Sequence, residues 1–147
     1  MNRLLSPKFG ALTALLLGSL MLLMGGGHLY GIISGALARE SSLDYRLVSL
    51  ITTGLLMALP GVVSLACLKW LWQGATWAYA MCILSASALM VYLGLLLSIQ
   101  DRDATKVGSE LDTAAIVVAV YLTVMIGTWV YLKLQARAAS SAQLHGG

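Results

Sequence analysis

Charged side chains are scarce in this sequence. They make up 10% of its 147 residues, while 59% of the residues are hydrophobic, and the mean hydropathy is +0.86. In an ordinary soluble domain roughly a quarter of the residues are charged. The scarcity of charge excludes such a domain and predicts a chain that is solvated by lipid.

Carboxylates are absent from every long apolar run. The six acidic residues fall in two short polar stretches: Glu40, Asp44, Asp101, Asp103, Glu110 and Asp112. A proton- or cation-coupled transporter needs a carboxylate within the membrane, where it exchanges a proton for the substrate. The sequence therefore argues against that class of transporter. The absence of a buried lysine likewise excludes a retinal-type pigment, which needs one for its Schiff base.

Cysteines and basic residues are present, but not in the patterns that redox or nucleic-acid chemistry requires. Cys67 and Cys82 do not form a C-x-x-C motif, so we expect buried, reduced thiols toward the cytoplasmic side. The formal net charge is +3, yet the basic residues stand singly. We expect no nucleic-acid partner, because binding a phosphate backbone takes a cluster of positive charges.

Four long apolar runs dominate what the sequence does contain. They cover residues 9–37, 47–68, 75–99 and 113–134, with boundaries that are approximate. About 20 apolar residues suffice for a helix to cross a bilayer. We predict an all-α integral membrane protein, a single bundle of four transmembrane helices with short loops and both termini on the same side. The tail 138–147 is small and polar, which predicts disorder.

Local features refine these spans. The run Gly25-Gly26-Gly27 predicts a bend in the first span, and Pro60 predicts a kink in the second. Ser109 and Asp112 match a capping box at the start of the fourth. Ala36-Leu37-Ala38 has the pattern of a signal-peptide cleavage site, but it lies too far along the chain, so we expect a retained span.

The orientation of the bundle follows from the basic residues. Five lie on the side of the termini and four on the other: Arg3, Lys8, Lys69, Lys133 and Arg137 against Arg39, Arg46, Arg102 and Lys106. Cytoplasmic loops carry the excess of Lys and Arg, and the first span usually dominates. Because Arg3 and Lys8 precede that span, we expect both termini in the cytoplasm, and we expect the membrane to be a bacterial cytoplasmic (inner) membrane.

His28 is the one acidic, basic or histidine side chain that lies well inside a predicted span. Ionisable residues within a membrane are functional-site candidates by default, so His28 is the candidate cofactor-binding residue. The structural alternative is a neutral histidine that hydrogen-bonds to another helix. A bis-histidine haem would require a dimer or a partner subunit, because His145, the other histidine, lies in the tail. No Cys, Asp or Glu accompanies His28 at helical spacing, so we expect no metal site.

Small residues form rows at four-residue spacing, and such rows let membrane helices approach closely. The rows are Gly10, Ala14 and Gly18 and then Gly27, Gly31 and Gly35 in the first span, and Ala115, Ala119, Thr123 and Gly127 in the fourth. We predict that they are helix-packing faces. Whether they pack within one chain or between chains stays open.

The four tryptophans all lie at the cytoplasmic ends of the predicted spans: Trp70, Trp72, Trp77 and Trp129. One interpretation is an aromatic belt at the level of the lipid headgroups. Because Lys69 and Lys133 stand beside these aromatic residues, the rim is also a candidate docking surface for a partner or a lipid.

No catalytic motif stands out, so we do not expect an enzyme. The function we favour is a non-catalytic membrane subunit or scaffold that packs with other membrane proteins, with copies of itself or with lipids. One alternative is a small-solute channel or carrier, with a polar path near His28 lined by Thr52, Thr53, Ser85 and Ser87. The other is a haem or redox subunit built around His28.

Overall fold

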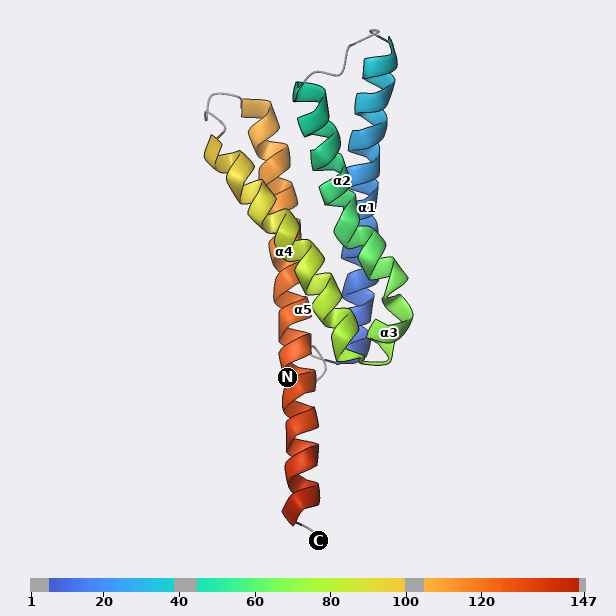
Figure 1. Cartoon of the computed structure of the whole chain (residues 1–147), viewed down its shortest axis with the longest axis vertical. Coiled ribbons are helices and arrows are strands. Elements are labelled where there is room, and N and C mark those ends of the chain that lie inside the picture. The colour runs from blue at the N-terminus through green and yellow to red at the C-terminus, as the bar shows by residue number, and fades with distance from the viewer. Residues whose placement is uncertain (1–5, 39–44, 100–104, 146–147) are drawn as a thin grey trace.

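The structure is a computed structural model, and it describes residues 6–38, 45–99 and 105–145. Those residues form five α-helices: α1 (Pro7–Ala38), α2 (Tyr45–Ala66), α3 (Leu68–Trp72), α4 (Thr76–Ile99) and α5 (Thr105–His145). The four long helices run up and down beside one another, and the short α3 lies between α2 and α4 in the chain (Figure 1). This order brings the start of α1 and the end of α5 toward the end of the bundle that holds α3.

Four helices are long and apolar enough to cross a membrane, over Pro7–Gly35, Leu47–Ala66, Thr76–Leu96 and Asp112–Ser141. Their outward faces are apolar as well, since Leu23, Leu84 and Val91 are 73%, 69% and 65% exposed. A helix that is hydrophobic on all sides is buried in protein on one face and in lipid on the other. The predicted all-α bundle of four transmembrane helices, in contact with lipid, is confirmed.

Helices α1 and α2 approach closely because glycines meet at their contact. Gly18 lies against Gly61, and Gly25 lies against Gly54. A side-chain carbon placed on Gly25 would lie 2.5 Å from the backbone nitrogen of Ala58, so the two backbones touch there. The glycines are seven residues apart in both helices, which keeps them on one face over two helical turns. This contact holds α1 and α2 together as one hairpin.

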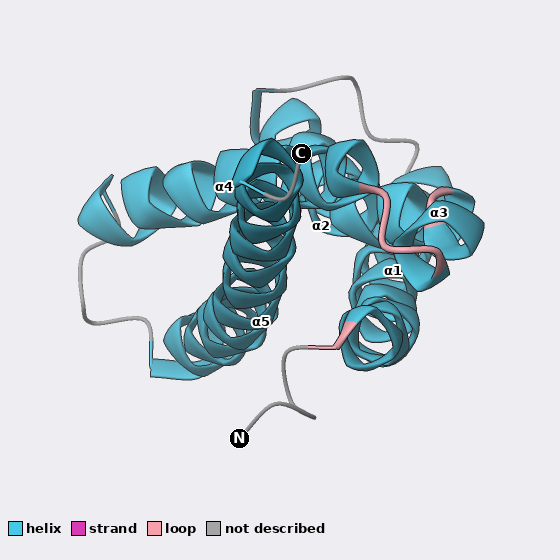
Figure 2. Ribbon diagram, turned by 90° about the horizontal axis from the view of Figure 1, so that it is seen from below, coloured by secondary structure: helices cyan, strands magenta, loops and turns pink. Residues whose placement is uncertain are grey.

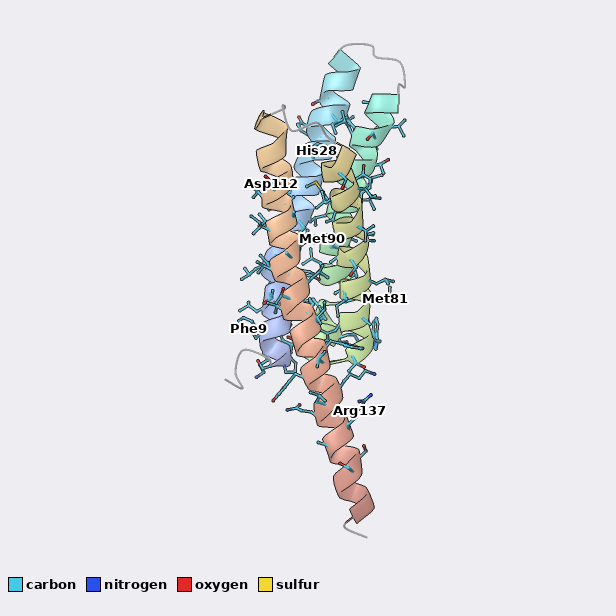
Figure 3. All side chains as sticks on the ribbon, turned by 90° about the vertical axis from the view of Figure 1, so that its left-hand side faces the viewer. Phe9, His28, Met81, Met90, Asp112 and Arg137 are labelled. Atoms are coloured by element: carbon cyan, nitrogen blue, oxygen red, sulfur yellow. The ribbon has the colours of Figure 1, made fainter. Side chains whose placement is uncertain are left out.

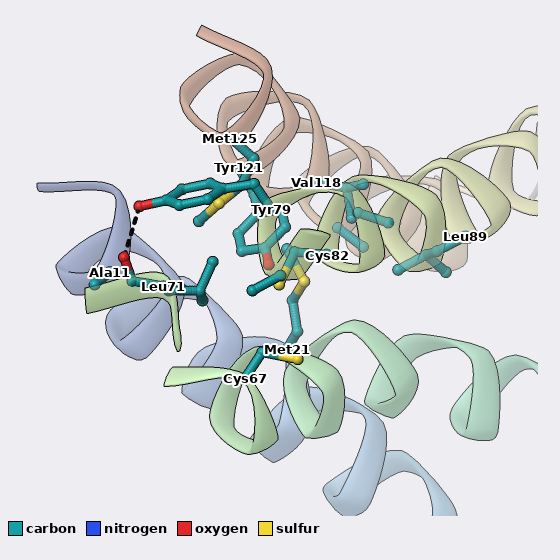
Figure 4. Packing of buried hydrophobic residues seen from close by; sticks show 14 of the residues in the cluster. Ala11, Met21, Cys67, Leu71, Tyr79, Cys82, Leu89, Val118, Tyr121 and Met125 are labelled. Carbon is teal, nitrogen blue, oxygen red and sulfur yellow. Dashed lines mark hydrogen bonds between the residues drawn. The ribbon is translucent and has the colours of Figure 1, made fainter. Parts of the chain in front are cut away.

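The buried core runs between the helices and follows steps of three and four residues along each of them. Its members on the last two helices are Ala78, Tyr79, Cys82, Ala86, Leu89 and Leu93 of α4, and Ala114, Val118, Tyr121, Met125 and Thr128 of α5. The first helix adds Ala11, Ala14 and Met21. Figure 4 shows Met21, Cys67 and Cys82, from different parts of the chain, converging within this cluster.

Two pairs of hydroxyl groups connect α2 to α4 and α5. Ser64 Oγ donates to the carbonyl of Pro60 at 2.6 Å, so Tyr121 of α5 is the donor in its 2.5 Å contact with Ser64. Thr53 Oγ1 donates to the carbonyl of Ser49, so the hydroxyl of Tyr92 on α4 donates to Thr53 at 2.9 Å. Both pairs satisfy polar atoms that would be costly to leave unpaired in the lipid phase.

Helix α5 differs most from the sequence prediction. It begins at Thr105 and ends at His145, so the expected disorder of the tail 138–147 is wrong for residues 138–145, which form the projecting end of the helix in Figure 1. Ser109 and Asp112 lie inside α5 and do not cap it. The tail is rich in alanine, the best helix former, and it continues a helix that is already nucleated.

The remaining sequence predictions concern the Gly25–Gly27 run of α1, Pro60 of α2 and the acidic residues. Helix α1 is continuous through the Gly25–Gly27 run, and α2 is continuous through Pro60. Of the acidic stretches, Asp112 lies near the start of α5, at the end of the bundle opposite α3 (Figure 3). Glu40, Asp44, Asp101 and Asp103 lie outside the described residues.

Candidate functional site

His28 continues the inward-facing stripe of α1. That stripe consists of the buried residues Ala11, Ala14, Gly18, Met21 and Gly25, and His28 is the next step of three. The side chain is half-buried, and its Nε2 atom is enclosed without a hydrogen-bond partner among the described residues. An enclosed polar atom without a partner costs about 1–3 kcal/mol. The structure therefore places His28 at an inner position where its Nε2 atom has no hydrogen-bond partner among the described residues.

An apolar cleft opens between the helices near this position. Its cavity volume is only about 10 Å³, and it is lined by Met21, Met24, Met57, Leu89, Ala114, Val117 and Val118. Met24 lies one helical turn before His28 on α1. All of the lining side chains are apolar and none donates a hydrogen bond, and the space is far smaller than a ligand pocket.

The hydroxyls that were predicted to line a polar path with His28 are bonded elsewhere. Thr52 donates to the carbonyl of Val48 at 2.8 Å and is exposed. Thr53 bonds within α2 and to Tyr92, and Ser85 donates to the carbonyl of Cys82 at 3.0 Å. Ser87 is half-buried on α4. Three of the four hydroxyls thus donate to the backbone of their own helix, and none of the four bonds to Nε2 of His28.

The glycine row in the C-terminal half of α1 has no partner within the described chain. Nothing lies within 4 Å of a side-chain carbon placed on Gly27, Gly31 or Gly35, and all three residues are exposed. Tyr30, on the same half of the helix, is 77% exposed. Packing of this row against another molecule stays a prediction.

The other predicted rows divide between packed and lipid-facing positions. Gly10, Ala14 and Gly18 are all buried, and Gly10 lies against Tyr79 and Thr128. The row of α5 lies beside its buried face: Ala115, Ala119 and Gly127 are half-buried, and Thr123 is exposed. Sequence reasoning missed Gly25, Gly54 and Gly61 as packing residues, although their shared seven-residue spacing was a usable signal.

The predicted tryptophan rim is centred on α3. Leu71 is fully buried, and the hydroxyl of Tyr79 contacts its carbonyl oxygen at 3.1 Å, the bond drawn in Figure 4. The helix therefore turns Lys69, Trp70 and Trp72 outward, and all three are exposed. The ring of Trp70 packs against that of Trp77, with centroids 5.3 Å apart. Seen from below in Figure 2, α3 lies beside α1.

Helix α5 contributes the remaining aromatic residue of the rim. The ammonium group of Lys133 lies over the ring of Trp129, 5.6 Å from its centroid. That distance is within the range of a cation–π contact. Lys133 itself is exposed, and Trp129 is half-buried. The structure thus gives Lys133 an aromatic neighbour on its own helix.

Both cysteines are free and buried. Cys67 follows directly after α2, outside the membrane span, and burial raises the pKa of its thiol. Cys82 lies in the core of the bundle. The prediction of buried thiols is consistent with these positions. Among the described residues, no group of three or more His, Cys, Asp or Glu side chains is placed to hold a metal ion.

Comparison of the chain with protein-family models, with curated proteins and with solved structures finds no match. The sequence and the geometry described above therefore carry the functional argument.

Proposed function

We propose that the protein is a non-catalytic membrane subunit or scaffold that holds another transmembrane helix against the C-terminal half of α1. The observation that carries this proposal is the exposed glycine row of Gly27, Gly31 and Gly35, which has nothing within 4 Å. The partner helix belongs to another membrane protein or to a second copy of this chain.

The face of α1 that packs against α2 supports the proposal by example. There, Gly18 and Gly25 bring the backbone of α1 into contact with that of α2. In lipid such close approach replaces the hydrophobic drive that holds soluble helices together, because packing and backbone dipoles gain from proximity. Gly27, Gly31 and Gly35 form a comparable row on a different face of α1, nearer its C-terminal end, where no described helix covers it.

We further propose that the membrane is a bacterial inner membrane and that both termini lie in its cytoplasmic side. The positions of Arg3 and Lys8 before the first span support this orientation. In this arrangement α3 and the projecting end of α5 face the cytoplasm, and the glycine row lies in the half of the membrane away from it.

Replacement of Gly31 by leucine tests the proposed contact. We expect the Gly31→Leu variant to lose the partner, or the second copy, that co-purifies with the wild-type protein in mild detergent. The side chain would fill the groove that the partner helix needs. Native mass spectrometry and size-exclusion chromatography with light scattering measure the loss.

Gly94→Leu is the matched control, because Gly94 is another exposed glycine of a membrane helix with nothing within 4 Å. Both substitutions add the same side chain to a lipid-facing position and raise helix propensity alike. Equal loss of the partner in both variants, or retention in both, contradicts the proposal. A wild-type protein that is monomeric without partners and shows haem absorbance in the visible range would favour the redox alternative at His28.

A further inference from the structure

The basic side chains that the structure describes gather at one end of the bundle. Lys8, Lys69, Lys133 and Arg137 are all exposed, and they come from α1, α3 and α5. The described carboxylate side chain, that of Asp112, lies at the opposite end of α5 (Figure 3). The end that holds α3 therefore presents positive charge with no described carboxylate beside it.

A tight turn at Gly74 lies close to the residues that precede Lys8 and Lys133 in the chain. Gly74 has a φ of 75°, the left-handed region that favours glycine. A side-chain carbon placed there would lie 3.3 Å from Pro7 and 3.7 Å from Leu132. Lys8 directly follows Pro7, and Lys133 directly follows Leu132. The turn thus joins the basic positions of α1 and α5.

Lys69 is linked to the same turn by backbone hydrogen bonds. The backbone N–H of Gln73 donates to the carbonyl of Lys69 at 3.3 Å, and that of Gly74 donates to Leu71 at 3.0 Å. The buried side chain of Leu71 holds this segment on the bundle. The backbone of Lys69 is therefore held by this turn, so only its side chain has to be ordered when a ligand binds.

The depth of this surface in the membrane indicates its ligand. The membrane spans reach the surface at Pro7, at Ala66 and at Thr76, so Lys8 and Lys69 lie at the level of the lipid headgroups. Trp70, Trp72 and Trp77 are 42%, 53% and 51% exposed at the same end. Indole rings favour the boundary between headgroup and hydrocarbon, and basic pockets between membrane helices bind anionic headgroups.

We propose that Lys8, Lys69 and Lys133 form a binding surface for the headgroup of an anionic phospholipid, with Trp70 and Trp77 against its glycerol and upper acyl chain. The positive side chains face the phosphate, and the paired indoles cover the apolar part of the same molecule. This surface is distinct from the glycine row of α1 and stands whether or not that row binds a helix.

Tryptophan fluorescence tests the proposal directly, because all four tryptophans lie at this end. The purified protein is reconstituted in phosphatidylcholine vesicles that contain a minor fraction of phosphatidylglycerol. Bromine atoms, which quench tryptophan on contact, are placed on the acyl chains of phosphatidylglycerol in one set and on an equal amount of phosphatidylcholine in the other. The ratio of quenching gives the relative affinity for the anionic lipid.

We expect the wild-type protein to prefer phosphatidylglycerol by about fivefold or more, and to lose up to about fivefold for each lysine replaced by glutamine. The variant with Lys8→Gln, Lys69→Gln and Lys133→Gln should show a ratio near one. Lys69→Gln alone serves where the triple variant does not fold. The matched control is Lys106→Gln, because position 106 lies 27 residues before Lys133 on α5, about 40 Å away.

A wild-type ratio near one would overturn the proposal. So would a triple variant that keeps the wild-type ratio. An equal loss in Lys106→Gln and Lys69→Gln would also overturn it, because it would show attraction to the whole protein charge instead of to this surface.

Discussion

At the scale of single residues, the hydroxyl groups of the core have two different tasks. Ser64 and Thr53 each donate to a carbonyl on α2 and accept from a tyrosine on another helix. The first bond is local and forms in any helix, whereas the second fixes which helices are neighbours. Tyr121, which is fully buried, is the more enclosed of the two tyrosine donors.

The change Tyr121→Phe isolates the contact between helices. Ser64 keeps its bond to Pro60, and one hydrogen bond between α2 and α5 is lost. We expect the free energy of unfolding to fall by about 0.6–1.7 kcal/mol, the range found for such bonds in membrane bundles. Denaturation in mixed micelles measures it. Tyr131→Phe is the control, because the hydroxyl of Tyr131 accepts from Gln135 on the exposed side of α5; an equal loss in both variants would contradict this role of Tyr121.

For His28, the sequence predicts the position of the residue but not the surroundings of its ring. Its position inside a span follows from the sequence, and the structure places it on the inward stripe of α1. The surroundings of its ring could not be predicted, because they depend on how far the helices stand apart at that level. The local bonding of Thr52 and Ser85 was missed for the same reason, since a hydroxyl in a membrane helix satisfies itself locally when no partner is near.

At the scale of elements, the contact between α1 and α2 depends on the absence of side chains. Gly61 lies against the backbone of Gly18 and against Leu22. Backbone atoms cannot move aside as a flexible side chain can, so even one added carbon must push the two helices apart.

The change Gly61→Ala is therefore expected to destabilise the bundle by about 1–3 kcal/mol or more. Thermal denaturation in detergent measures the effect. The same substitution at Gly94, where nothing lies within 4 Å, is expected to be neutral or slightly stabilising because alanine is the better helix former. A Gly61→Ala variant that is as stable as the Gly94→Ala variant would contradict the close contact of α1 with α2.

Spans were predictable from the sequence, but their packing faces were only partly so. Lipid accepts apolar side chains on every face, so a long apolar run identifies a membrane helix without showing which side is buried. The rows of Gly10, Ala14 and Gly18 and of Gly27, Gly31 and Gly35 look alike in sequence, yet the first is buried and the second is exposed. The helix α3 was missed because five residues are too few to give a periodic pattern.

At the scale of the whole molecule, the orientation in the membrane can be tested with the protein's own thiols left in place. Cys67 and Cys82 are buried, and burial raises the pKa of Cys67. The thiolate is the form that reacts with maleimides, so a raised pKa lowers the background labelling of Cys67 at neutral pH. The labelling of single cysteines introduced on the surface can then be measured without removing the native ones.

We expect an impermeant maleimide added to intact cells to label Thr105→Cys and not Ser140→Cys. Position 105 begins α5, and Ser140 is exposed near its other end. Opening the cells should make Ser140→Cys reactive. Labelling of Ser140→Cys alone from outside would invert the proposed orientation, and the protein without an added cysteine should remain unlabelled in both experiments.

The continuity of α5 has a mechanical consequence. A helix of 41 residues is about 62 Å long, which exceeds the hydrocarbon thickness of about 30 Å. No described break divides the part within the bilayer from the projecting end. We therefore expect α5 to move as one rigid rod. When the bundle tilts in the membrane, the tip of α5 is displaced sideways on the far side of the headgroups.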